Sequence, residues 1–110
     1  MLISSLVLAA MLQSPTAAVD TTRVAFTKCL NAQMKTSLEA KVTSAEFETT
    51  LKAACEKERD AFRKAVIAAD RAGGDSEAIA TENADMQVED YHANFGDKFK
   101  DYSETNTLPG

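Results

Sequence analysis

The chain has 110 residues, enough for one domain at most, and 45% of them are hydrophobic, close to the average for folded proteins. Its formal net charge is −5, which argues against nucleic acid and anionic membrane surfaces as partners because both are held mainly by lysine and arginine. The apolar residues recur at helical spacing rather than being scattered, so we expect a folded, all-α protein.

The start of the chain resembles an export signal in its composition. Residues 2–12 are apolar apart from two serines, and a polar, small-residue stretch follows at residues 14–18. We therefore predict a cleavable signal peptide over residues 1–18, with cleavage after Ala18, although residues 1–3 carry no lysine or arginine. The apolar run is too short to span a bilayer, which takes about 20 residues. The expected location is periplasmic or extracellular.

The first predicted helix covers residues 21–40. Asp20 stands where a carboxylate can accept hydrogen bonds from the free N–H groups of the first turn, and Val19 with Val24 has the spacing of a hydrophobic staple. Apolar side chains then step by three and four residues, which places them on one face of a helix. They are Phe26, Cys29, Leu30, Met34 and Leu38.

The second predicted helix covers residues 44–72 and has a well-defined start. Thr43 followed by Glu46 is a capping box, and Val42 with Phe47 is a second staple. One apolar stripe runs the whole length of this segment, so we expect a single continuous helix. The stripe, in which Glu58 is the one charged member, consists of Phe47, Leu51, Ala54, Cys55, Glu58, Phe62, Ala65 and Ala69.

A third helix is predicted after a glycine pair. Arg71 and Gly73 mark the end of the second helix, because glycine adopts the left-handed conformation that closes a helix. The chain starts again at Asp75 or Ser76, and the new helix covers residues 76–102. Its core stripe is Ala80, Ala84, Val88, Tyr91, Phe95, Phe99 and Tyr102.

The two cysteines are placed to form a disulfide. Cys29 and Cys55 lie thirteen residues on either side of Val42, so they face each other if the chain folds back there into an antiparallel hairpin. Both lie on apolar stripes, and an exported protein meets an oxidising compartment. Such a bond would stabilise the chain by about 3.5 kcal/mol in the chain-entropy model. A redox-active or metal-binding pair is disfavoured, since the C-x-x-C spacing and further ligands are missing.

Together these elements predict an antiparallel three-helix bundle over residues 19–102. It consists of a helical hairpin stapled by one disulfide and a long third helix that folds back on it. Gly96 is a weak point of the third helix, costing up to about 1 kcal/mol against alanine. Residues 103–110 are predicted to be a flexible tail.

Candidate chemistry is sparse. His92 is the only histidine, and with Glu89 it forms one E-x-x-H motif, whereas di-iron bundles need that motif twice. A haem held between Met34 and His92 is a formal alternative, but the hairpin geometry sets the two apart and no C-x-x-C-H motif is present. No catalytic triad or phosphate loop is recognisable. We therefore expect no enzymatic activity, no cofactor and no metal.

Acidic residues on the second and third helices could suggest a divalent cation, but no EF-hand pattern accompanies them, so a solvated acidic face is expected. Glu58 is the exception, because a carboxylate on an apolar stripe needs a partner; Arg59, Arg63 or Tyr91 could supply it, and a catalytic glutamate is the alternative. The acidic set is Glu56, Glu58, Asp60, Asp85, Glu89 and Asp90.

A difference in helix length suggests an uncovered surface. A first helix that starts near Asp20 would leave the tip between the second and third helices without a covering helix, and exposed apolar patches often mark contact surfaces. Two interpretations stay open: the tip is a surface that binds a partner, or its two helices pack closely on their own alanines. In an uncleaved precursor, the leader could extend the first helix over the tip. The candidate partner surface is Val66, Ile67, Ala69, Ile79 and Met86.

These observations favour a non-enzymatic, exported helical protein that binds another protein or itself. A stress chaperone or holdase that opens to expose aromatic faces is the alternative. A metal- or haem-binding helical protein ranks third.

Overall fold

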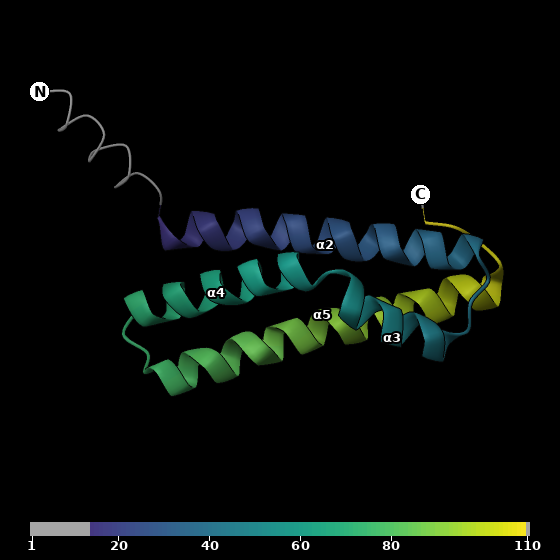
Figure 1. The fold of residues 1–110 in the computed structure, drawn as a ribbon. Helices are drawn as coiled ribbons and strands as arrows, with labels where there is room; N and C mark the ends of the chain where they lie inside the picture. Colours follow the sequence, from purple (N-terminus) through teal and green to yellow (C-terminus); the bar gives the residue numbers. More distant parts are fainter. Residues whose placement is uncertain (1–13, 110) are drawn as a thin grey trace, which may run out of the picture.

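The computed structural model describes residues 14–109, which form four α-helices and no strand (Figure 1). The all-α prediction is thus confirmed for this part of the chain, while most of the predicted signal segment lies outside the described residues. No helix within the described range is both long and apolar enough to cross a membrane. The helices are α2 (Pro15–Glu39), α3 (Ser44–Ala54), α4 (Glu56–Ala72) and α5 (Glu77–Thr105).

Helix α2 begins earlier than the sequence suggested. Ser14 is its N-cap and accepts a hydrogen bond from the Ala17 N–H at 3.1 Å, while Pro15 occupies the first turn, where its missing N–H costs nothing. The prediction that Asp20 caps this helix is wrong: Asp20 lies inside α2 and pairs with Arg23 at 2.7 Å. The predicted staple does not close the first turn either, because Val24 is 64% exposed.

The turn after α2 places a lysine in the left-handed conformation. Lys41 has φ 55°, and its N–H donates to the Leu38 carbonyl at 3.1 Å while the Val42 N–H donates to the Ser37 carbonyl at 3.2 Å. This pair of bonds is a Schellman motif, in which glycine normally holds the left-handed position. The chain reverses direction here, as the hairpin prediction requires.

Replacing Lys41 with glycine is expected to raise the free energy of unfolding by about 0.5–1 kcal/mol, because glycine adopts this conformation without the steric cost of a Cβ. Urea unfolding followed by circular dichroism measures the change. Lys35→Gly, an exposed position inside α2, is the control and should destabilise by about 1 kcal/mol. A loss of stability at both positions would contradict the strain at Lys41.

The predicted helix over residues 44–72 is broken in two at Cys55. Its start is as expected, since the Thr43 hydroxyl accepts from the Glu46 N–H at 3.2 Å. At Cys55, however, the backbone leaves the helical region with φ −111° and ψ 32°, so residues 14–109 form four helices where three were expected. On the α3 side of this break, α3 packs on α5, where the Phe47 and Phe99 rings stack with centroids 4.3 Å apart.

Helix α4 ends in a second Schellman motif. The Gly74 N–H donates to the Arg71 carbonyl at 3.1 Å, and the Asp75 N–H donates to the Asp70 carbonyl at 3.0 Å. The left-handed residue is Gly74, with φ 106°. The prediction that Gly73 takes this conformation is wrong, because Gly73 keeps a helical φ of −81°. Of the two predicted starts for α5, Ser76 is the N-cap and accepts from the Ile79 N–H at 3.2 Å.

Helix α5 runs past its predicted end at Tyr102 to Thr105, where Asn106 closes it at φ 55°. The first residues of the predicted tail therefore belong to this helix. Gly96, expected to be a weak point, is buried, and a Cβ there would meet Oε1 of Glu48 at 3.3 Å. The side chain of Glu48 in α3 therefore lies directly over this glycine.

The core lies where α2, α4 and α5 run side by side, with α3 against the second half of α5 (Figure 1). Phe26 is its central member: its ring is 5.8 Å from those of Phe62 and Tyr91 and 5.9 Å from that of His92. Burial of these side chains is the main favourable term for folding. The buried core residues are Phe26, Leu30, Met34, Phe47, Leu51, Cys55, Phe62, Val66, Ala84, Val88, Phe95 and Phe99.

Candidate functional site

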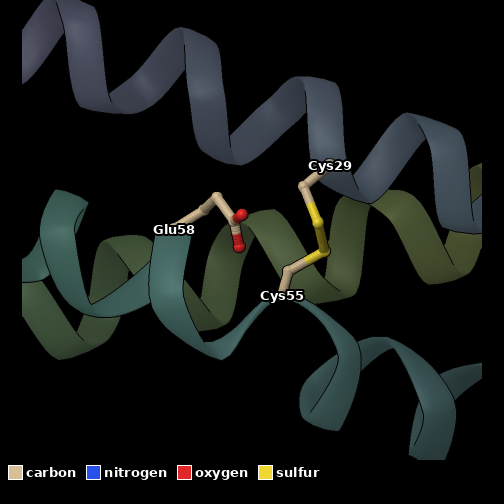
Figure 2. Close-up of side chains that lie close together, drawn as sticks. All are labelled: Cys29, Cys55 and Glu58. Atoms are coloured by element: carbon tan, nitrogen blue, oxygen red, sulfur yellow. A yellow bond between two sulfur atoms is a disulfide. The ribbon is translucent and has the colours of Figure 1, made fainter.

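The predicted disulfide is confirmed and lies at the break between α3 and α4. Cys29 projects from α2 and is partly buried, Cys55 is 1% exposed, and their Cα atoms are 6.1 Å apart (Figure 2). A disulfide between two parts of the core indicates a non-reducing environment. Cys55 thus both ends one helix and ties the next to α2.

A carboxylate stands beside this disulfide. An oxygen of Glu58 and the Sγ atoms of Cys29 and Cys55 all lie within 4.8 Å of one another, and Figure 2 shows the carboxylate directed at the bond. Bonded sulfurs are not thiolates, so these three residues cannot act as a thiolate metal site while the disulfide is intact. The arrangement instead places one carboxylate on one side of the disulfide.

The partners predicted for Glu58 are engaged elsewhere. Arg59 pairs with Asp60 at 3.0 Å, and Arg63 pairs with Asp85 across to α5 at 2.7 Å. The third candidate, Tyr91, lies edge-on to the Phe62 and Phe26 rings. Within residues 14–109, Glu58 makes no hydrogen bond or ion pair, so no partner holds its carboxylate away from the disulfide.

Glu58→Gln is expected to speed reduction of the disulfide by glutathione about threefold to fivefold, because unit charges about 5 Å apart in water interact by about 0.8 kcal/mol. The attacking species is an anionic thiolate, which the carboxylate repels. The rate is measured by quenching with an alkylating agent and mass spectrometry.

Two controls isolate this effect. Cysteamine, whose ammonium group offsets its thiolate, should show a much smaller acceleration, and Glu77→Gln, a change of the same charge at the far end of α5, should show almost none. Equal acceleration in both glutamate variants would mean that overall charge, rather than Glu58, controls the rate.

His92 is a second unusual group, because its Nε2 atom is buried without a hydrogen-bond partner. The ring packs edge-on against Phe26 and lines a groove with Lys52 and Arg59. Burial lowers the pKa of His92, the positive charges of Lys52 and Arg59 lower it further, and Glu89 opposes them. The imidazole is therefore held neutral.

This arrangement does not support the haem alternative. His92 packs on Phe26, whereas Met34 lies two turns further along α2, about 12 Å away at helical rise. A di-iron site needs two E-x-x-H motifs, and the chain has only one histidine with which to form them. The structure thus places the His92 ring against the aromatic core.

Stability is expected to fall as the pH drops from about 7.5 to about 5.5, because unfolded histidine, with a pKa of about 6.5, binds a proton that folded His92 resists. His92→Phe, which keeps a ring against Phe26, should remove this dependence. Urea unfolding at several pH values measures it. Most carboxylates titrate below this range, so an unchanged slope in the variant would show that His92 is not the group responsible.

The candidate partner surface is covered more than the sequence suggested. Because α2 begins at Pro15, its first turns line a shallow hollow together with Val66 and Ala69, and Val66 is 3% exposed. Ile67 is partly buried against the core. The expectation of a bare tip is therefore wrong for the α4 side of the tip.

The α5 side of the tip remains open. Ile79 and Met86 are 56% and 58% exposed, and residues seven apart lie two turns along one face of a helix. Glu82 and Asp90 share this face, which we call the α5 face (Ile79, Glu82, Met86 and Asp90). From residue 77 to residue 94, α5 has five acidic side chains and no lysine or arginine. The sequence did not predict that some of these acidic residues share a face with Ile79 and Met86.

Comparison with known proteins does not add a family: no protein-family model matches the chain, and neither the curated proteins nor the solved structures give a significant match. The function is therefore argued from the chain's own residues.

Proposed function

We propose that this chain is an exported, non-enzymatic helical protein, periplasmic or extracellular, that binds another protein through the α5 face. The observation that carries the proposal is the exposure of Ile79 and Met86 on one face of a helix whose opposite face is buried. Large apolar side chains gathered on one face favour a contact surface. The disulfide is consistent with an exported protein. We propose that the fold that carries the α5 face is an antiparallel helical bundle.

The charge around the α5 face favours one kind of partner. Glu82 and Asp90 lie on the face itself, and Glu89 is exposed beside it. A second copy of the chain would bring like charges together, which costs free energy. The surface therefore fits a basic amphipathic helix, whose apolar side chains contact Ile79 and Met86 while lysine or arginine meets the acidic groups.

A pair of synthetic helices tests this proposal. A basic amphipathic peptide and an acidic peptide with the same apolar residues are titrated into the protein, and binding is followed by fluorescence anisotropy. The basic peptide should bind more tightly, and added salt should weaken it. Ile79→Ser with Met86→Ser should weaken it about tenfold or more.

Val24→Ser is the matched control, since Val24 is as exposed as the two apolar residues but lies on α2. It should leave binding unchanged. Equal binding of the two peptides, or no loss in the Ile79 and Met86 variant, would contradict the proposal. Sedimentation of the protein alone should show a monomer, and a dimer abolished by the same two substitutions would favour self-association instead.

A stress chaperone or holdase is the second candidate. The disulfide ties α2 to α4, but α5, which supplies Tyr91, Phe95 and Phe99 to the core, has no covalent link to the other helices. Separation of α5 would expose these aromatic rings to a client protein. Suppression of client aggregation that survives Ile79→Ser with Met86→Ser would support this function over the first one.

A further inference from the structure

The break at Cys55 has no cause in the local sequence. Residues 53–57 contain no glycine or proline, and alanine, glutamate and lysine around the cysteine are good helix formers. The apolar stripe also continues across it, since Leu51, Cys55 and Phe62 are all buried. Local propensity and the pattern of burial both favour one helix over residues 44–72.

The start of α4 also differs from the other helix starts. Ser14, Thr43 and Ser76 each accept a hydrogen bond from the first turn of their helix, whereas Cys55, at the same position before α4, makes no such bond. The first backbone bond of α4 runs from the Arg59 N–H to the Cys55 carbonyl at 2.9 Å. The N–H groups of Glu56, Lys57 and Glu58 therefore lack the carbonyl partners that a continuous helix would provide.

The bond that constrains this position is the disulfide. Cys55 is joined to α2 through Cys29. Before the break, α3 packs on α5 through the stacked rings of Phe47 and Phe99. We infer that the Cys29–Cys55 disulfide is a redox latch: oxidised, it holds the break and keeps α3 on α5, and reduced, it lets residues 44–72 form one helix that withdraws Phe47 from Phe99.

The chemistry of the change is thiol–disulfide exchange. Two molecules of a monothiol supply two electrons and two protons and are themselves joined in a disulfide, while Cys29 and Cys55 each become a thiol. Cys29 is partly buried and Cys55 is buried, so attack by the thiolate is expected at the sulfur of Cys29. Withdrawal of α3 would uncover the half of α5 that carries Phe95 and Phe99, a surface separate from the α5 face and independent of the function proposed for it.

Amide exchange and chemical shifts measured by NMR test the latch in the full folded protein, before and after reduction with dithiothreitol. In the oxidised protein the amides of Glu56, Lys57 and Glu58 should exchange rapidly. After reduction they should exchange about tenfold or more slowly, with helical Cα shifts through residues 53–58, and the contacts between the Phe47 and Phe99 rings should disappear.

Cys29→Ala separates loss of the bond from any effect of the reductant and keeps the buried Cys55 side chain in place. It should reproduce the reduced state without added thiol. Unprotected amides at residues 56–58 with the ring contacts intact would overturn the inference, since packing alone would then hold the break. Loss of the helical Cα shifts of α2 and α5 would overturn it too, because the disulfide would then staple the whole fold.

Discussion

Replacing Phe26 with alanine is expected to lower the free energy of unfolding by about 3–5 kcal/mol. Phe26 is 0% exposed, and its ring lies against three others, those of Phe62, Tyr91 and His92. These neighbours come from α4 and α5, so the cavity opens where three helices meet. Rings held by several elements cannot collapse into the space, which places the cost in the upper part of the range for core deletions.

Val24→Ala is the matched control for this prediction. Val24 lies on the same helix but is 64% exposed, so its truncation should change stability by less than about 0.5 kcal/mol. Urea unfolding of both variants gives the comparison. Similar losses at the two positions, or a loss below about 1.5 kcal/mol at Phe26, would show that α2 does not pack on α4 and α5 as described.

Replacing Cys29 and Cys55 with alanine is expected to cost about 3 kcal/mol, the second largest effect. The cysteines are 26 residues apart, and closing a loop of that size removes about 3.5 kcal/mol of chain entropy from the unfolded state. Backbone hydrogen bonds regained across the break in a continuous helix would offset part of this loss. For a small domain the remaining cost is a large share of the total stability.

Reduced protein provides the control for this double substitution. Unfolding in the presence of dithiothreitol removes the bond but keeps both side chains, so the difference between the reduced protein and the double variant measures the packing of the Cys29 and Cys55 side chains. That difference should be about 1 kcal/mol or less. No loss of stability on reduction would contradict a structural role for the disulfide.

The helical class, the reversal at Val42 and the cysteine pairing were all predictable because each depends on local spacing. Capping at Thr43 and Ser76 and the apolar periodicity of three and four residues are properties of short segments. Predicting the cysteine pair required one further observation, that Cys29 and Cys55 lie at equal distances in sequence from the turn at Val42. These signals require no knowledge of how distant side chains pack.

The break at Cys55 could not be predicted for the opposite reason. Its neighbours favour a helix, and the structure departs from that preference at a position where α3 packs on α5 and Cys55 is tied to Cys29. The burial of Gly96 could not be predicted for the same reason, because the closeness of the Glu48 side chain of α3 depends on how α3 packs on α5.

The start of α2 was predicted near Thr21, after the expected cleavage point, whereas the Ser14–Pro15 pair begins the helix in the described residues. The later start predicted a shorter first helix and a bare tip, whereas α2 covers Val66. Ile79 and Met86 were placed correctly, since their exposure depends on α5 alone.

Glu58 and His92 show the limit of residue-level reasoning about a site. Both were singled out as groups that needed a partner, but nothing in their spacing indicated that Glu58 would face the disulfide or that the Nε2 atom of His92 would be buried against Phe26. Such contacts depend on the relative rotation of three helices. A signal for Glu58 was present, since it follows Cys55 by three residues and so lies on the same side of the helix.

The central claim is that the chain doubles back at Val42 and joins Cys29 to Cys55, and non-reducing peptide mapping of protein purified from its native compartment tests it most directly. The account predicts an intact mass lower than that of the dithiol by two hydrogen atoms, and one cross-linked peptide pair containing Cys29 and Cys55. Two cysteines that both react with an alkylating agent before any reduction would contradict it.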